Sequence, residues 1–485
     1  MRSTQKPNFV FVFADQLRAS ELSCYGGENI QTPNIDSLAG DGVRFSNAVS
    51  TYPVCSPFRA MLMTGLYPMR NGMVCNDHYL KPSVPSFAEA FNEAGYHTGY
   101  IGKWHIDGWG RLEHIPQERR LGFKHWQAIE CTHDYFSSQY YSDDSKRPRF
   151  WEGYDAQTQT KAACDYISQR EDEEPFALFL SWGPPHDPYI APQKYVDQVK
   201  SKEIKLRPNV ADRTAADELS KSRRITAPSS YGHIRDEIRQ WLSDDKIIYE
   251  STVGYLAAIL ALDEYVGDLI ESLKKEGVFD NTIFVFTSDH GDVLGSHGFY
   301  GKCTPFEEAI SIPFIVRFPN YVPAGKITDE LFTPVDIMPT LLGLADVDCP
   351  EVDGIDMSKA LTGKGSGYRD AVPLMNMTHL CNTSLANGTD TWRGVKTHRY
   401  TYSRYEDGTP WLLYDNCYDP YQLNNLAERS EYADVRDQLD KRLDELLVEM
   451  GDTLSTKELY DKIITEKPTR ELVTAFREAN PNKSI

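Results

Sequence analysis

Four short runs of apolar residues constrain the fold more than any other feature of this sequence. They cover residues 8–14, 98–101, 176–182 and 282–286. Their apolar residues are largely continuous rather than alternating, which is typical of parallel strands buried on both faces of a sheet. Apolar residues make up 40% of the 485-residue chain, which is enough for a large core. We therefore predict an α/β fold with a large mixed, mostly parallel sheet sandwiched by helices.

The spacing of apolar residues changes after residue 375. Before it, a long amphipathic helix is predicted over residues 244–275. After it, residues 393–415 alternate like antiparallel strands around a turn at Asp407-Gly408, and one helix is predicted over residues 426–450. We therefore expect a catalytic α/β domain over residues 1–375 and a smaller C-terminal α+β domain over residues 376–485. Residues 106–155 are weakly patterned, and we expect them to be insertions over a site rather than core, while residues 200–240 are expected to form a surface excursion.

Each apolar run is followed by polar residues of a kind that carries chemistry. These residues are Asp15 and Gln16, Lys103 and His105, His186, and Asp289 and His290. Because the carboxyl ends of parallel strands meet at one edge of a sheet, the four clusters should converge. The oxygen donors, with the adjacent imidazole of His290, suit one divalent cation such as Ca²⁺, Mg²⁺ or Mn²⁺. No Cys/His spacing supports zinc.

Cys55 lies in a segment that predicts the first turn of a helix. We expect Ser56 to cap this helix, Pro57 to occupy its first position and Gly65 to end it. Backbone N–H groups and the helix dipole would then favour negative charge at Cys55, and Arg59 would add a cation one turn later. Together with Lys103, Lys302 and the histidines, the residues predict a metal-assisted hydrolase of an anionic ester.

Composition excludes some partners. The chain carries 51 basic and 71 acidic residues, a formal charge of −20, which argues against nucleic acid as a partner. Nine dispersed cysteines indicate reduced thiols rather than a disulfide framework. No run is long enough to span a membrane, and no signal peptide is visible. The sequence as given therefore predicts a cytoplasmic protein, or a periplasmic or secreted one if a signal peptide has been removed.

Several motifs in order resemble those of the type I sulfatases. The resemblance covers residues 8 to about 450 and centres on Cys-Ser-Pro-Phe-Arg at residues 55–59, followed by Thr-Gly at 64–65. The family's usual pattern is Cys-x-Pro-Ser-Arg, so Phe58 is a departure, as is Gln16 where many sulfatases have a second Asp. The other matching blocks are Gly-Lys-Trp-His at 102–105, Pro-His-Asp-Pro-Tyr at 185–189, Ser-Asp-His-Gly at 288–291, Gly-Lys at 301–302 and the closing segment at 414–426.

The resemblance implies an alkaline-phosphatase-like fold and a set of roles. The cysteine of the motif, here Cys55, is converted by a formylglycine-generating or equivalent maturation enzyme to formylglycine, whose hydrate is the nucleophile. By this analogy one divalent metal, Ca²⁺ ahead of Mg²⁺ or Mn²⁺, is bound by residue 55 and by the residues at two strand ends. The implied metal ligands are Asp15, Gln16, Cys55, Asp289 and His290, and the implied catalytic residues are Cys55, Arg59, Lys103, His105, His186 and Lys302.

The resemblance also implies the roles of these catalytic residues. Lys103, Lys302 and Arg59 hold the sulfate oxygens or the formylglycine. His186 helps to protonate the leaving alcohol, and His105 is the base that allows sulfate to be expelled.

Three functions are open at this point. The first is a sulfatase acting on a sulfated carbohydrate or another alkyl or aryl sulfate ester. The second is a formylglycine-dependent phosphonate monoester or phosphodiester hydrolase, which Asp-Gln with Asp-His also resembles. The third is a catalytically silent protein that keeps the pocket for binding. The sequence does not select the sulfate ester.

Overall fold

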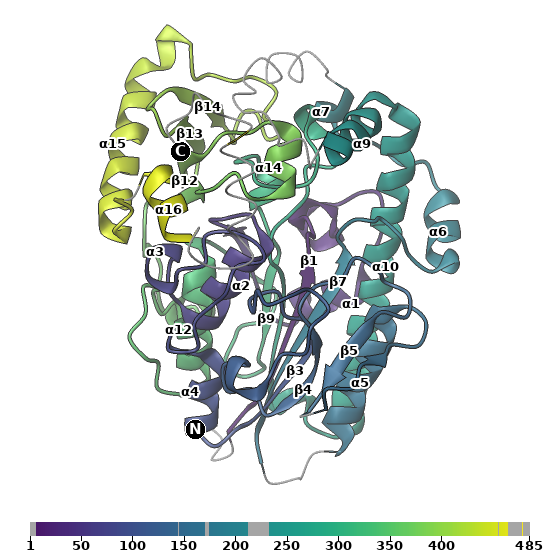
Figure 1. Cartoon of the computed structure of the whole chain (residues 1–485). Helices are drawn as coiled ribbons and strands as arrows, with labels where there is room; N and C mark the ends of the chain where they lie inside the picture. The colour runs from purple at the N-terminus through teal and green to yellow at the C-terminus, as the bar shows by residue number, and fades with distance from the viewer. Residues whose placement is uncertain are drawn as a thin grey trace.

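The strand β1 (Asn8–Asp15) lies inside a mixed sheet of the computed structural model, which describes residues 6–143, 145–169, 174–211, 232–453, 455–463 and 478. Within these residues ten strands pair in the order β10-β2-β9-β8-β1-β7-β3-β4-β5-β6 (Figure 1). The other nine strands span Val43–Ala48 (β2), His97–Lys103 (β3), His125–Ile129 (β4), Gln139–Ser142 (β5), Arg149–Phe150 (β6), Phe176–Pro185 (β7), Thr282–Ser288 (β8), Phe314–Arg317 (β9) and Lys326–Phe332 (β10).

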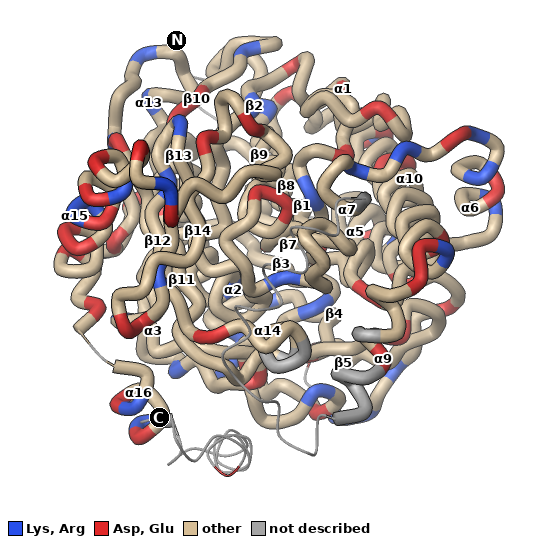
Figure 2. The backbone as a smooth tube through the Cα atoms, turned by 90° about the horizontal axis from the view of Figure 1, so that it is seen from above, with Lys and Arg blue, Asp and Glu red and all other residues tan. Residues whose placement is uncertain are grey.

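The four predicted runs are neighbours in this sheet. β8, β1, β7 and β3 pair in parallel, with Phe11 opposite Phe179 on one side and Val285 on the other. β9 runs antiparallel to both β8 and β2, so the sheet is mixed, as expected. The α/β prediction is therefore confirmed, and the carboxyl ends of these four parallel strands lie along one edge of the sheet. Figure 2 shows β8, β1, β7 and β3 close together near the middle of the molecule.

Helices cover both faces of the sheet. Along β1, Phe9, Phe11 and Phe13 pack into one core cluster, while Val10 and Val12 pack into the other. Successive strand residues point to opposite faces, so an unbroken apolar run fills both cores at once. The first core is covered by α2 (Cys55–Thr64), α4 (Phe87–Glu93) and α12 (Pro334–Ala345), and the second by α1 (Pro33–Gly40), α5 (Asp155–Gln169) and α10 (Asp245–Lys275) (Figure 1).

The long helix α10 begins and ends as the sequence predicts. Asp244 caps its first turn by accepting the backbone N–H groups of Lys246 and Ile247. Two lysines lie in its last turn, where the negative end of the helix dipole favours cations. The shorter helices are α3 (Pro68–Asn71), α6 (Gln193–Lys200), α7 (Pro208–Ala211), α9 (Gly232–Ser243), α11 (Glu307–Ile310), α13 (Ser358–Leu361), α14 (Asn382–Asn387) and α16 (Thr456–Ile463).

A second, antiparallel sheet follows in the order β11-β12-β13-β14. Its strands span Ala371–Asn376, Trp392–Thr397, Tyr400–Tyr405 and Pro410–Asp415. One face of this sheet packs against α15 (Ala433–Met450), whose buried side chains are Leu439, Leu443 and Leu446. The smaller C-terminal sheet and long helix are therefore present. The division of the chain after residue 375 stays a prediction, and β11 already begins at Ala371.

Two boundaries differ from the sequence-based expectation. The C-terminal helix begins at Ala433 rather than near Leu426, because the Leu426 N–H donates to the Leu413 carbonyl and ties that segment to β14. Residues 106–155 are not only insertions, since β4 extends the main sheet by pairing in parallel with β3. Trp126 of β4 is fully buried there, so this short strand is core although its polar neighbours hide the pattern. Part of the weakly patterned 200–240 region, residues 212–231, lies outside the described residues.

In the part of the chain that the structure describes, the helices are all too short or too polar to cross a lipid bilayer.

Candidate active site

Cys55 is the first residue of α2, and it is only 1% exposed. The predicted cap was wrong: Val54 is the N-cap residue, and its carbonyl accepts the Phe58 N–H at 3.0 Å. Ser56 and Pro57 are the second and third residues of the helix, so Pro57 is not at the first position that the sequence predicted. The Ser56 N–H donates to the side-chain oxygen of Asn76 at 2.9 Å. The helix ends at Gly65, as expected, where φ is 66°. Cys55 therefore lies at the N-terminal end of α2, where the helix dipole favours negative charge.

Positive groups surround the Cys55 thiol. Its Sγ lies 2.9 Å from Lys302 Nζ, 4.0 Å from Lys103 Nζ and 3.3 Å from His290 Nε2. Burial alone would raise the pKa of Cys55, but the charges of Lys103, Lys302 and His290 hold it well below its usual value. The surroundings of Cys55 therefore stabilise negative charge, as the sequence predicted for an anion site.

Arg59 lies one turn after Cys55, between the ends of β1 and β8. Its Nη2 donates to Asp15 Oδ2 at 3.1 Å and to Asp289 Oδ2 at 3.2 Å. Its Nη1 donates to the Lys103 carbonyl and to Ser181 Oγ, each at 2.7 Å. The guanidinium is 1% exposed, so it acts as a buried clamp on two carboxylates that would otherwise repel each other.

Asp15, Gln16, Asp289 and His290 fit a divalent cation. Asp15, Cys55, Asp289 and His290 each offer one ligand atom, and these atoms all lie within 4.8 Å of one another. The Gln16 Oε1 is buried and has no hydrogen-bond partner, which suits a ligand oxygen. The Nδ1 of His290 is 2.9 Å from the Gly291 carbonyl, and a proton on Nδ1 leaves Nε2 free to ligate. Oxygen-rich donors of this kind favour Ca²⁺, Mg²⁺ or Mn²⁺.

The amide of Gln16 is held by residues that the sequence analysis did not select. Its Nε2 donates to Asp292 Oδ2 at 2.6 Å and to Asp187 Oδ1 at 3.4 Å. Asp292 also accepts the hydroxyl of Tyr189 at 2.8 Å. Asp187 lies inside the matching block at 185–189, and Asp292 directly follows the block at 288–291, so their places in the motifs were the available signal.

Backbone strain marks two of the predicted residues. Gln16 has φ 70° and His105 has φ 61°, in the left-handed region that side chains other than glycine rarely adopt. Tyr255 of α10 stabilises the first of these turns by donating to the Gln16 carbonyl at 2.7 Å and accepting the Arg18 N–H at 2.8 Å. No sequence pattern forecasts these conformations.

The two predicted proton-transfer residues are both buried beside carboxylates. The Nδ1 of His186 lies 2.7 Å from the carbonyl oxygen of Asp187 and 3.2 Å from its Oδ1. Burial alone would lower the pKa of His186, but Asp187 and Asp15 raise it above its usual value. The Nε2 of His105 lies 3.4 Å from Asp77 Oδ1, while its Nδ1 is buried without a hydrogen-bond partner.

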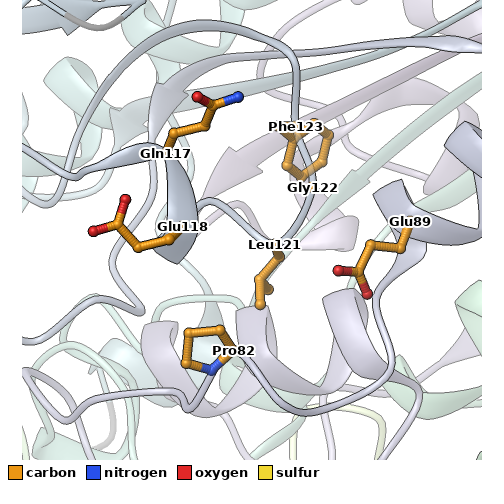
Figure 3. A pocket seen from close by; sticks show the side chains of 7 residues that line it. All are labelled: Pro82, Glu89, Gln117, Glu118, Leu121, Gly122 and Phe123. Atoms are coloured by element: carbon orange, nitrogen blue, oxygen red, sulfur yellow. The ribbon is translucent and has the colours of Figure 1, made fainter.

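The structure thus gathers Asp15, Lys103, Asp289, His290 and Lys302 around Cys55. Arg59 and Gln16 are joined to this group through hydrogen bonds to Asp289. His105 and His186 flank this group. A separate cavity of about 420 Å³ lies elsewhere and contains none of these residues (Figure 3). Two acidic side chains, Glu89 and Glu118, line that cavity, so it does not suit an anionic substrate.

Comparisons with known proteins give two family models and several similar proteins. A family model described as "Sulfatase" matches residues 7–347, and a second, "N-sulphoglucosamine sulphohydrolase, C-terminal", matches residues 295–449. A relative named "Ulvan-active sulfatase" from Formosa agariphila is 35% identical, over 94% of this chain and 84% of its own length.

Two solved structures are also similar. One is described as a complex with its substrate D-glucosamine-2-N,6-O-disulfate; it is 26% identical, with a TM-score of 0.80 over 93% of this chain and 99% of that chain. A phosphonate monoester hydrolase of Agrobacterium radiobacter has a TM-score of 0.72 over 92% of this chain and 96% of its own, at 23% identity. The second likeness shows the fold alone.

Proposed function

The chain belongs to the sulfatase family and is a sulfuric ester hydrolase, and from this premise we propose that the pocket around residue 55 cuts a sulfate ester of a saccharide. The observation that carries the proposal is the Cys55 side chain itself. It lies at a helix N-terminus, 2.9 Å from Lys302 and within reach of a cluster of metal-ligand residues. A sulfated sugar as the substrate class is supported by the disulfated glucosamine of the similar complex.

Cys55 is proposed as the precursor of formylglycine. The Cys55 thiol then occupies the position that the nucleophilic oxygen would have in the mature enzyme. The two lysines beside the thiol, Lys103 and Lys302, favour an oxygen nucleophile with negative character at the same place. Maturation would need a formylglycine-generating enzyme as a partner. Phe58, which departs from the family's usual motif, is fully buried in the core that covers one face of the sheet, so it has a packing role in the folded chain.

One divalent cation, with Ca²⁺ as the first choice, would be held by Asp15, Gln16, Asp289, His290 and residue 55. Such a cation supplies positive charge that stabilises an oxygen nucleophile and the developing charge on the ester. Arg59 contributes indirectly: it keeps the carboxylates of Asp15 and Asp289 side by side by donating to both.

Lys103 and Lys302 are proposed to bind the sulfate oxygens. Lys103 Nζ also donates to Asp15 Oδ2 at 2.7 Å, which fixes the direction of its side chain toward the pocket. Both ammonium groups are about 4% exposed, and a buried cation attracts an anion far more strongly than one in water. They would therefore stabilise the extra negative charge of the transition state.

His186 and His105 are proposed to move the protons. With its Nδ1 oriented by Asp187, His186 can present Nε2 to the oxygen of the departing sugar. His105, held by Asp77 through Nε2, has its buried and unpartnered Nδ1 available as the base that releases sulfate. Each transfer typically contributes about 10²–10⁴ in rate.

Parallel assays with sulfate and phosphate esters test the proposal. The purified chain is given 4-nitrophenyl sulfate, bis(4-nitrophenyl) phosphate and D-glucosamine-2-N,6-O-disulfate, and nitrophenol and inorganic sulfate are measured. Faster turnover of the sulfate esters is expected. Faster turnover of the phosphodiester would instead favour the phosphodiester or phosphonate hydrolase, and mass spectrometry of the peptide with residue 55 would detect the aldehyde. An unconverted thiol with no turnover of any ester would favour the binding protein.

A further inference from the structure

Two loops beside the pocket are joined by a shared carboxylate. Asp77 accepts from Arg111 Nε at 3.0 Å and from Arg111 Nη2 at 2.7 Å. The same Asp77 Oδ1 lies 3.4 Å from His105 Nε2. The three side chains thus form a row, and exposure rises along it: the side chain of His105 is 2% exposed, that of Asp77 28% and that of Arg111 41%. The row leads from the candidate base out to solvent.

The backbone places this row at the rim of the sulfate pocket. Asn76, the residue before Asp77, accepts the N–H of Ser56, which is next to Cys55 in α2. The Arg111 carbonyl accepts the Cys131 N–H at 3.1 Å, just beyond the end of β4, which pairs with β3. Arg111 is therefore tied both to the start of α2 and to the strand ends that carry the site.

The loop between His105 and Arg111 also presents an exposed aromatic ring. Trp109 is 58% exposed, and its ring meets Tyr79 edge-on at 6.0 Å. The guanidinium of Arg119 lies over its face at 5.4 Å. An indole held between two neighbours keeps a fixed orientation, and a large exposed aromatic in a fixed orientation is typical of a binding surface.

Hydrogen bonds and close packing fix the backbone of the loop that carries Trp109. Glu130 accepts the N–H groups of Asp107 and Gly108 at 2.9 and 2.8 Å. Gly108 packs so closely that a Cβ there would lie 2.6 Å from the backbone carbonyl carbon of His78, and its φ is +69°. The position of Trp109 is therefore set by packing and hydrogen bonds, and the sequence uses a glycine where only glycine fits.

We propose that Trp109 and the Asp77–Arg111 pair form a saccharide subsite that binds the pyranose ring of the sulfated substrate beside the sulfate pocket. The apolar C–H face of a pyranose packs on an indole. Among the described residues no hydrogen bond reaches Arg111 Nη1, which is free to donate to sugar hydroxyls or to an anionic substituent. Asp77 keeps lone pairs that accept from hydroxyls. This inference rests on the proposed function and names the residues that select its substrate.

The test compares a substrate that has a sugar ring with one that has none. Wild type and Trp109→Ala are assayed with 4-nitrophenyl sulfate, D-glucosamine-2-N,6-O-disulfate and a sulfated disaccharide containing a uronic acid. We expect kcat/KM on the better saccharide to fall at least tenfold more than on the aryl sulfate, mainly through KM. Trp109→Phe should restore part of the difference, since it keeps a stacking face. The two saccharides also show whether Arg111 meets a second sulfate or a carboxylate, because Arg111→Gln should lower kcat/KM most on the saccharide whose anion it binds.

Tyr418→Ala is the matched control. Tyr418 is 83% exposed and has the Arg399 guanidinium 5.2 Å from its ring centre, so it resembles Trp109 in chemistry but lies in the C-terminal part of the chain. Its replacement should leave all three rates unchanged. Equal losses on the three substrates in Trp109→Ala, or no loss, would overturn the subsite. Wild-type turnover of the aryl sulfate with neither saccharide cut would do the same. Wild-type turnover of none of the three would contradict the proposed function, on which the subsite depends.

Discussion

Replacement of Arg59 by alanine should destabilise the fold strongly, because this guanidinium is the shared counter-ion of two buried carboxylates. It donates to Asp15 and Asp289 and to two neutral acceptors, and both carboxylates are fully buried. Removal of one partner from a buried ion pair typically costs about 3–5 kcal/mol. Since a folded chain has about 5–15 kcal/mol in total, we expect the Arg59→Ala variant to be marginally stable.

The free energy of unfolding is measured by urea denaturation at pH 7 in EDTA for wild type, Arg59→Lys and Arg59→Ala. Lysine keeps the charge but cannot reach four acceptors, so an intermediate loss is expected. Added Ca²⁺ should restore part of the stability of Arg59→Ala, because a cation replaces the missing positive charge.

Arg404 provides the control for this series, since it also bridges two carboxylates, Asp440 and Asp444, but near the surface. Its replacement by alanine should cost no more than about 1 kcal/mol. If Arg59→Ala also lost less than about 1 kcal/mol, the carboxylates would have to be hydrated or protonated, and the clamp argument would be refuted.

The remaining predictions concern the nucleophile, the sulfate ligand, the metal and the pH. Cys55→Ala should abolish sulfate release while the circular dichroism spectrum stays that of wild type; rates near wild type would contradict a nucleophile at residue 55. Lys302→Ala should lower kcat by at least about 10² because a buried ligand of the sulfate is lost, whereas an unchanged kcat would remove Lys302 from the site. EDTA should abolish activity, with recovery on Ca²⁺ exceeding that on Mg²⁺ or Mn²⁺, and Gln16→Asp should tighten Ca²⁺ binding measured by calorimetry. Burial raises the pKa of Glu130 to about 7 from 4.5, so the native state holds a proton that the unfolded chain releases. The contribution of Glu130 to stability should therefore fall by about 3 kcal/mol as the pH rises from 4.5 through 7. The difference in unfolding free energy between wild type and Glu130→Gln, measured by urea denaturation across this range, should show that slope.

The central strands of the sheet could be predicted from the sequence because burial alone determines their residue pattern. The apolar runs at β1, β7 and β8 fill two cores at once, so burial alone identified them, and the common edge of parallel strands then brought Asp15, His186 and Asp289 to one place. The core role of β4 was missed because its few apolar residues are set among polar ones. Its burial depends on pairing with β3, which is a long-range contact.

The finer parts of the site depend on contacts that a sequence does not display. Val54 could take the N-cap position in place of Ser56 because Asn76 satisfies the free N–H. The left-handed backbone at Gln16 is stabilised by Tyr255, which is far away in the chain. Asp77 and Arg111 lie in weakly patterned loops. Only the folded structure shows that the carboxylate of Asp77 contacts both Arg111 and His105.

The complete burial of α2 bears on whether residue 55 can be modified before or after the chain folds. All ten residues from Cys55 to Thr64 are buried, and Phe58 in the middle of the helix is packed in the core. If a second enzyme converts residue 55 as proposed, it cannot reach this side chain once the sheet and α12 have packed around α2. The proposed conversion would then have to precede folding, and a chain that folded first would keep its thiol.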